Sequence, residues 1–181
     1  MIFGLFRKDP RRTQIALLYK RIATASRDSG LFARLQIPDT LEGRFESLSL
    51  HMVLMLRALR TMAAPADEVA KDLTDAFFRD MDASLREMGV GDTVVPKRMK
   101  KIASSFYGRA HAYDGPLDAG DKAALAAALG RNVYGGEAPA VPLARYALAA
   151  DYGLKQADLD AVLDVGPVFP RPEAFAEEGS R

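Results

Sequence analysis

The strongest constraint on the fold is a run of apolar residues spaced at alternating steps of four and three. The run consists of Leu41, Phe45, Leu48, Met52, Met55, Leu59 and Met62. This spacing puts every member on one side of an α-helix, and Leu50 and Leu54 add a second apolar flank. Asp39 or Thr40 can cap the amino end of the helix. Because a helix that is apolar on two sides must be covered on two sides, the sequence predicts a long central helix.

Other segments with helical spacing lie on both sides of this helix in the chain. They are residues 13–26, 66–88, 96–110, 121–129, 140–152 and 156–163. No segment shows the alternation of apolar and polar residues that is typical of a half-buried strand. We therefore expect an all-α fold, a single-domain bundle of about six to seven helices around the central one. The helical domain is expected to span 12–165, between a flexible basic and apolar N-terminus (1–11) and a flexible, proline-rich tail (166–181).

Length, charge and cysteine content limit the classes of function. A chain of 181 residues fits one domain, and 25 Lys and Arg against 24 Asp and Glu give a net charge of +1. This balance argues against binding to nucleic acid through bulk charge, so DNA is not an expected partner. The chain has no cysteine, which excludes disulfides, thiolate nucleophiles and cysteine-based metal sites.

Two apolar stretches were considered as targeting or membrane segments. The apolar start of the chain is shorter than the core of a signal peptide. The longest uncharged apolar stretch, 47–56, is shorter than a membrane-spanning helix. We therefore expect a cytoplasmic protein. The apolar residues at the start of the chain, followed by Arg7 and Lys8, can also touch an anionic membrane surface, and a frayed terminus is the alternative.

The chain lacks the residue patterns of common catalytic and metal centres. Its two histidines, His51 and His111, lie sixty residues apart, and there is no Gly-x-Ser-x-Gly sequence. Glu-x-x-His, His-Glu-x-x-His and phosphate-binding Gly-x-x-x-x-Gly-Lys sequences are also absent. We therefore expect no enzyme activity, no catalytic residue, no metal and no cofactor.

A narrow polar seam interrupts the apolar faces of the central helix. Arg44, Ser47 and His51 share this seam, and polar groups in such a position need partners. The expected cross-helix ion pairs join Arg44, Arg98 or Arg109 to Asp80 or Glu87. One interpretation is a buried polar network of Arg44, His51 and Asp80 that fixes helix packing. The other is a ligand or partner site that uses the same groups.

The charge of the chain changes sign between two neighbouring predicted helices. Residues 66–92 hold eight acidic and three basic side chains, whereas residues 96–111 hold five Lys and Arg and no acid. With Phe106 and Tyr107 nearby, the basic segment can meet RNA phosphates, anionic lipid or an acidic partner. A solvated helix face that complements its acidic neighbour is the alternative.

Several short blocks of sequence resemble one protein family. They are residues 77–82, 85–92, 95–101 and 106–109, with 38–40, 43–46 and 50–51 upstream and 131–134 downstream. Together they resemble the signature of the ubiquinol-cytochrome c chaperone family, and the similarity extends over residues 14–150.

The resemblance implies an all-helical, non-enzymatic assembly factor for ubiquinol-cytochrome c reductase that acts on newly made cytochrome b or its assembly intermediates. Mitochondrial members work with a small partner protein and at the ribosome, whereas this chain resembles a bacterial member. For such a member, peripheral contact with the cytoplasmic face of the inner membrane is a further expectation. A lipid or quinone carrier and an RNA- or ribosome-binding module are the alternative functions.

The expected binding surface follows from charge and exposure. The loop 89–95 lies between the acidic and the basic segment, and the two-sided central helix can supply an apolar groove beside it. The residues expected to bind a partner are Asp82, Glu87, Asp92, Lys97, Arg98, Lys100, Lys101, Tyr107 and Arg109.

Overall fold

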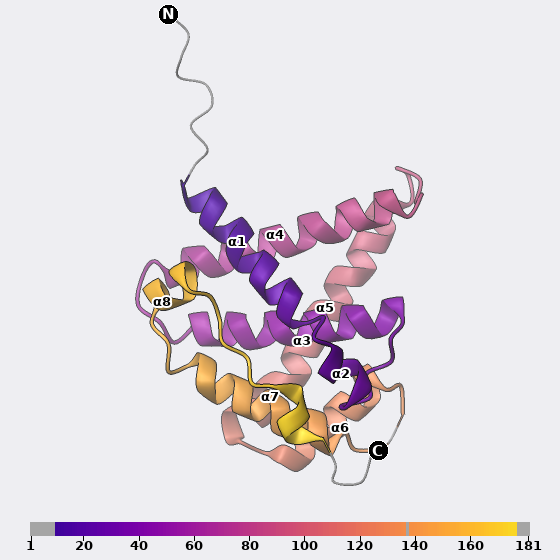
Figure 1. The fold of residues 1–181 in the computed structure, drawn as a ribbon. Coiled ribbons are helices and arrows are strands. Elements are labelled where there is room, and N and C mark those ends of the chain that lie inside the picture. Colours follow the sequence, from indigo (N-terminus) through magenta and orange to yellow (C-terminus); the bar gives the residue numbers. More distant parts are fainter. Residues whose placement is uncertain (1–9, 137, 177–181) are drawn as a thin grey trace, which may run out of the picture.

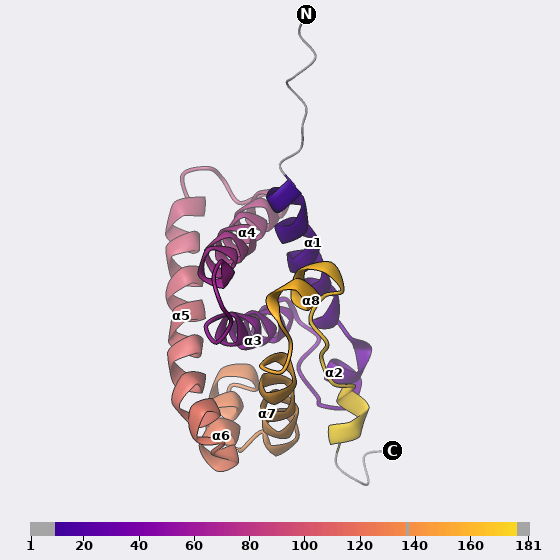
Figure 2. The same cartoon turned by 90° about the vertical axis from the view of Figure 1, so that its left-hand side faces the viewer.

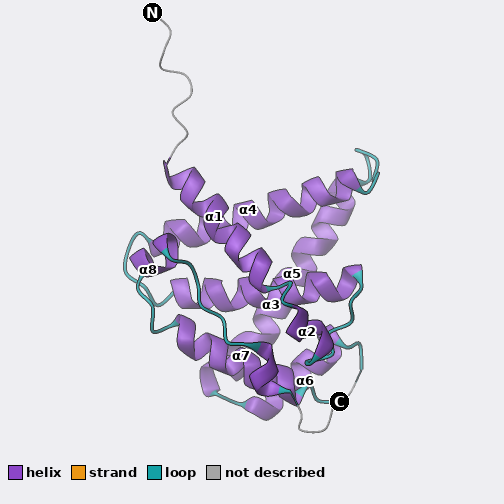
Figure 3. Ribbon diagram, in the orientation of Figure 1, coloured by secondary structure: helices purple, strands orange, loops and turns teal. Residues whose placement is uncertain are grey.

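The computed structural model describes residues 10–136 and 138–176, which form one helical bundle (Figure 1). Its elements are α1 (Pro10–Ala25), α2 (Ser29–Ala33), α3 (Leu41–Leu59), α4 (Ala66–Glu87), α5 (Val95–Ala119), α6 (Lys122–Val133), α7 (Val141–Leu154), α8 (Leu159–Asp164) and the 3-10 turn η1 (Pro172–Phe175). All regular structure within these residues is helical (Figure 3). The predicted all-α, single-domain bundle is confirmed. None of the described helices is long and apolar enough to cross a membrane.

The long central helix predicted from the apolar pattern is α3. Thr40 caps it, since its hydroxyl oxygen accepts a hydrogen bond from the Gly43 N–H at 3.1 Å. Figure 2 shows α1 and α4 on one side of α3 and α6 and α7 on the other, with α5 crossing beside it. Leu50 and Leu54, the predicted second flank, are both fully buried. The apolar pattern on two sides of α3 therefore corresponds to two packed layers.

Helices α4 and α5 diverge from the turn that joins them (Figure 1). An aromatic cluster holds them together partway along, where the rings of Phe77 and Phe106 are 4.8 Å apart and those of Phe78 and Tyr107 are 6.0 Å apart. Beyond this cluster the two helices separate, and α3 lies beneath the space between them. The sequence thus folds into a V of two helices whose open part has α3 as its floor.

Helix α5 is longer than the pattern predicts. It continues past residue 110 through Gly115 and Pro116 to Ala119, and Gly120 ends it in a left-handed conformation, with φ of 62°. Glycine and proline usually indicate a helix end, but Tyr113 and Leu117 are buried in the core on this last part of α5. Tertiary packing therefore extends the helix beyond the local signal.

The C-terminal segment differs from the flexible tail that the sequence predicts. Residues 166–176, here called the C-terminal strap, lie against the bundle. The Phe169 ring is 4.7 Å from the His51 ring and the Phe175 ring is 5.8 Å from that of Tyr146. Pro172 is buried next to Gly30, and a Cβ added to Gly30 would lie 3.0 Å from the Cβ of Pro172. Apolar anchors hold the strap although its glycine and proline content is typical of a loop. Of the other predicted flexible residues, 10 and 11 belong to α1, where Arg11 pairs with Glu68 and Asp72, and 1–9 and 177–181 lie outside the described part.

Two glycines of the long helices give opposite expectations for stability. In Gly43→Ala the new Cβ would lie 1.8 Å from the Pro38 carbonyl oxygen, so we expect a loss of about 2 kcal/mol in the free energy of unfolding. Gly108 lies inside α5 with no atom within 4 Å of a Cβ. Gly108→Ala is therefore expected to stabilise by about 0.5 to 1 kcal/mol. Urea unfolding followed by circular dichroism measures both, and equal effects would contradict this account.

Candidate docking groove and charged turn

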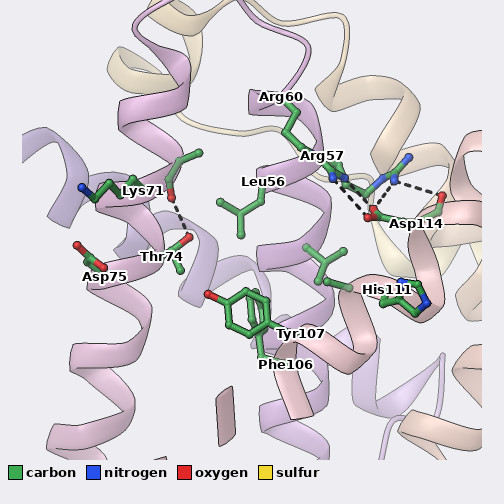
Figure 4. Close-up of a pocket in the computed structure, with 13 residues that line it drawn as sticks. Leu56, Arg57, Arg60, Lys71, Thr74, Asp75, Phe106, Tyr107, His111 and Asp114 are labelled. Atoms are coloured by element: carbon green, nitrogen blue, oxygen red, sulfur yellow. Dashed lines mark hydrogen bonds and ion pairs between the residues drawn. The ribbon is translucent and has the colours of Figure 1, made fainter. Parts of the chain in front are cut away.

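An open groove of about 610 Å³ lies between the diverging parts of α4 and α5 (Figure 4). Its apolar lining consists of Val53 and Leu56 of α3, Ala70 of α4 and Phe106 and Ala110 of α5. Its polar lining consists of Arg57, Arg60, Lys71, Thr74, Asp75, Tyr107, His111 and Asp114. The floor therefore offers apolar surface to a partner, and the rim offers charge.

The polar side chains of the groove differ in how they are held. Thr74 donates a hydrogen bond to the Ala70 carbonyl of its own helix at 2.8 Å. Lys71 and Asp75 lie one turn apart at the outer edge of the α4 wall (Figure 4), and neither has an ion-pair partner among the described residues. Tyr107 is 56% exposed at the opposite wall. These side chains are available to a bound molecule.

A cluster of charges lies at one end of the groove. Arg57, only 3% exposed, donates to Asp114 at 2.5 Å, to Asp118 at 2.6 Å and to Asp151 at 2.9 Å. Arg60 also donates to Asp114, at 2.7 Å. One arginine of α3 thereby binds carboxylates of both α5 and α7. Such a cluster fixes the geometry of three helices even where its net contribution to stability is small.

The cluster changes the pKa of its members. Burial alone would lower the pKa of Arg57, but the hydrogen bonds that it donates to three carboxylates raise it above the usual value. Burial would raise the pKa of Asp114, yet hydrogen bonds from Arg60 and Arg57 bring that pKa below its ordinary value. A hydrogen bond from Arg57 also lowers the pKa of Asp118. Arg57, Asp114 and Asp118 therefore stay charged near neutral pH.

A second buried ion pair joins α5 to α3 and corrects one predicted site residue. Arg109, expected to bind a partner, forms a two-pronged ion pair with Glu46, which is 6% exposed. The Arg109 guanidinium also lies 5.7 Å from the centre of the Phe45 ring. The predicted acidic partners Asp80 and Glu87 are therefore wrong for Arg109, whose role here is structural.

The predicted polar network of Arg44, His51 and Asp80 is not one network. Arg44 is exposed and pairs with Asp39 at 2.8 Å. Asp80 accepts a hydrogen bond from the Tyr19 hydroxyl at 2.7 Å, between α4 and α1. His51 is fully buried and bonds elsewhere. The helical seam placed these residues on suitable faces, but their partners come from three different neighbours.

His51 is held as a neutral imidazole in the core. Burial, opposed by a hydrogen bond to the Ser47 carbonyl, lowers the pKa of His51 to about 4. Nδ1 lies 2.7 Å from the Ser47 carbonyl oxygen, to which only a protonated nitrogen can donate. Nε2, 2.7 Å from the Tyr146 hydroxyl, then accepts from that hydroxyl. Among the described residues, no group of three or more His, Asp or Glu is placed to hold a metal.

The turn between α4 and α5 carries most of the other predicted binding residues. Asp82 accepts from Arg86 at 2.6 Å, and Arg86 also pairs with Asp92 across the turn. The exposed predicted residues near this turn are Glu87, Lys97, Arg98, Lys100 and Lys101. Of the predicted set, Tyr107 alone also lines the groove.

Most of the groove lining was not predicted from the sequence. The missed lining residues include Leu56, Ala70, Thr74, Ala110 and Asp114. Ala70 and Thr74 are small residues one turn apart on one face of α4, a pattern that allows close approach of a partner. No such local signal identifies Arg57 and Asp114, because their partners lie far away in the chain.

The chain is similar to known proteins in both sequence and fold. The model of the family described as ubiquinol-cytochrome C chaperone matches residues 33–169. The crystal structure of the Cbp3 homolog from Brucella abortus has 40% sequence identity and a TM-score of 0.81, and the alignment covers 96% of this chain and 98% of that chain. The comparison with curated protein sequences finds no match.

The buried arginine of the charge cluster is expected to matter far more than an exposed one. Arg57→Met keeps an apolar stem but leaves Asp151, 5% exposed, with Lys155 as its only ion-pair partner among the described residues, so we expect a loss of about 2 to 3 kcal/mol in the free energy of unfolding. The matched control Arg44→Met breaks only the exposed pair with Asp39 and is expected to change it by about 0.5 kcal/mol or less. Similar losses in the two variants, measured by urea unfolding, would refute this assignment.

The neutral state of His51 predicts a pH dependence of stability. Because its folded pKa of about 4 lies below the ordinary 6.5, protons bind preferentially to the unfolded chain, and stability falls as the pH drops from 6.5 toward 4. The expected loss from pH 7 to pH 5 is about 2 kcal/mol. The lowered pKa values of Asp114 and Asp118 make stability depend on pH only below this window. His51→Gln should flatten the pH profile of urea unfolding in this window, and an unchanged slope would disprove the neutral assignment.

Proposed function

Because the chain belongs to the ubiquinol-cytochrome c chaperone family, we propose that it is a non-enzymatic assembly chaperone of ubiquinol-cytochrome c reductase that binds newly made cytochrome b. The observation that best supports this proposal is the open groove with an apolar floor and a charged rim. A chaperone of this kind holds another polypeptide on its surface and releases it unchanged.

The physical requirements of such a client fit the groove. A membrane protein that has not yet assembled exposes apolar helices, which need temporary cover, and charged loops, which need opposite charge. The groove floor between α4 and α5 offers the first. The charged turn, with Lys97, Lys100 and Lys101 on α5 and Glu87 on α4, offers the second. Both lie along the same pair of helices, so one client can contact both.

The proposed place of action is the cytoplasmic face of the inner membrane, where the client inserts. The basic amino-terminal half of α5 is also the surface on which we place a small partner protein or the ribosome. Binding to ribosomal RNA through these cations would weaken steeply with salt, whereas binding of an apolar client would not. Salt dependence therefore distinguishes the two kinds of partner.

A lipid or quinone carrier is the second candidate function, and the groove shape favours the chaperone. A carrier of apolar small molecules needs an enclosed cavity that removes most of the ligand surface from water. The groove between α4 and α5 is open along its length, and its rim includes Arg60, Lys71 and Asp75. Such a site suits a polypeptide, because other parts of the bound polypeptide can cover the open side of the groove.

The charged turn predicts a loss of assembly on charge reversal. Replacing Lys97, Lys100 and Lys101 by glutamate is expected to lower the level of assembled, heme-containing cytochrome b in cells by about threefold or more. The new carboxylates would repel the acidic loops of the client that the three lysines are proposed to bind. Difference spectra of membranes measure this level, and a strain without the gene sets the baseline.

The control carries the same charge change on another face. Lys122, Arg131 and Arg145 are exposed on α6 and α7, and their replacement by glutamate should leave assembly unchanged. Equal effects of the two triple variants would remove the charged turn from the binding surface. An unchanged cytochrome b level in the strain without the gene would overturn the chaperone function itself.

A further inference from the structure

We propose that the groove between α4 and α5 takes one amphipathic α-helix of the client, with its carboxyl end toward Arg60 and Lys71. This inference rests on the proposed function and names what binds at the groove. Helices α4, α5 and α3 surround the groove on three sides, so a bound helix would complete a four-helix arrangement. The open side of the V is the position of the missing helix.

The chemistry of the walls favours a helix over an extended segment. An extended peptide that bonds its backbone N–H and C=O groups to a protein commonly does so by adding to a strand edge. The groove is lined by α3, α4 and α5, whose interior backbone groups bond within each helix, and the described residues contain no strand. A segment buried there must satisfy its own backbone, which a helix does. The groove therefore selects for helical occupants.

The side chains of the walls set how closely the helix can approach. Ala70 and Thr74 form the inner face of the α4 wall, and Ala110 faces them from α5. Small residues such as these let two helix axes come close, whereas Tyr107 limits the narrow end of the groove. From Tyr107 to Asp114 the α5 wall extends over about two turns, or ~10 Å. The apolar stripe of the bound helix is expected to match that length.

Charges at the rim give the helix a direction. Arg60 and Lys71 lie toward the end of the groove where α3 ends and α4 begins, and Asp75 lies one turn further along α4. The carboxyl end of a helix carries partial negative charge and its amino end partial positive charge. A helix antiparallel to α4 puts its carboxyl end near Lys71 and near Arg60, which also pairs with Asp114, and its body then runs past Asp75 toward Tyr107. An acidic side chain in its last turns would meet Lys71.

A designed peptide tests this directly. The probe is a lactam-bridged helix of about four turns, built from Leu, Ala, Glu and Lys with one Trp on its apolar face and a Glu placed to meet Lys71. Because the chain itself contains no Trp, the emission of the peptide reports binding without background. We expect the bridged peptide to bind at least about tenfold more tightly than the same sequence broken by a central proline.

Two pairs of variants locate the peptide in the groove. Ala110→Trp fills the groove and should abolish binding, whereas the matched Ala123→Trp, at an exposed position on α6, should not. Lys71→Glu should weaken binding about tenfold, and a peptide with Lys in place of the facing Glu should recover it. Lys122→Glu is the charge control. Circular dichroism checks that each variant is folded. If Ala110→Trp fails to fold, the Lys71 exchange, which combines Lys71→Glu with the peptide that carries Lys in place of Glu, still tests the proposal.

Three results would overturn the inference. They are equal binding of the bridged and the proline-broken peptide, unchanged binding to a folded Ala110→Trp, and no recovery in the Lys71 exchange. In cells, Ala110→Trp should lower assembled cytochrome b relative to Ala123→Trp. If it does not, while the strain without the gene still lacks assembled cytochrome b, the groove assignment fails and the proposed function stands.

Discussion

The geometry of the molecule depends on two arginines, the buried Arg57 and the half-buried Arg109, that fix α5 across α3. Arg57 reaches outward from α3 to carboxylates of α5 and α7, and Arg109 reaches back from α5 to Glu46. These contacts hold α5 at two points along its length. Removing Arg109 would leave the buried Glu46 without an ion-pair partner among the described residues, and removing Arg57 would leave Asp151 with Lys155 alone. Such a loss costs more than the pair itself contributes. The ion pairs therefore specify one arrangement of the helices more than they add to stability.

The open groove follows from this arrangement. Helix α4 meets α5 through the aromatic cluster and is held from its other side by α1, where Arg11 pairs with Asp72 and Tyr19 with Asp80. With α5 fixed on α3 and α4 fixed on α1, the two helices cannot close on each other. Apolar surface of Leu56, Ala70 and Ala110 thus stays partly accessible without being left to a flexible loop. A rigid V is well suited to binding, because little conformational entropy is lost when the partner arrives.

Local patterns in the sequence predicted the helices but not the interactions between them. The spacing from Leu41 to Met62 identifies α3 and its two packed sides because burial acts on every turn of that helix. Arg57 lies on the same helix, yet its partners are more than fifty residues away and leave no local trace. The strap was predicted to be flexible because its proline and glycine residues indicate a loop. Those residues carry no information about what the loop contacts. The groove could not be predicted for the same reason as the partners of Arg57, because its lining comes from three separate helices of the chain.

The strap also has a consequence for the order in which the protein is made. It follows every helix of the bundle in the chain, and it covers the face where His51 and Tyr146 meet. During synthesis, α3, α4 and α5 leave the ribosome well before the strap does. The three walls of the groove can therefore assemble on the nascent chain, while the opposite face of the bundle stays uncovered until the strap itself has left the ribosome.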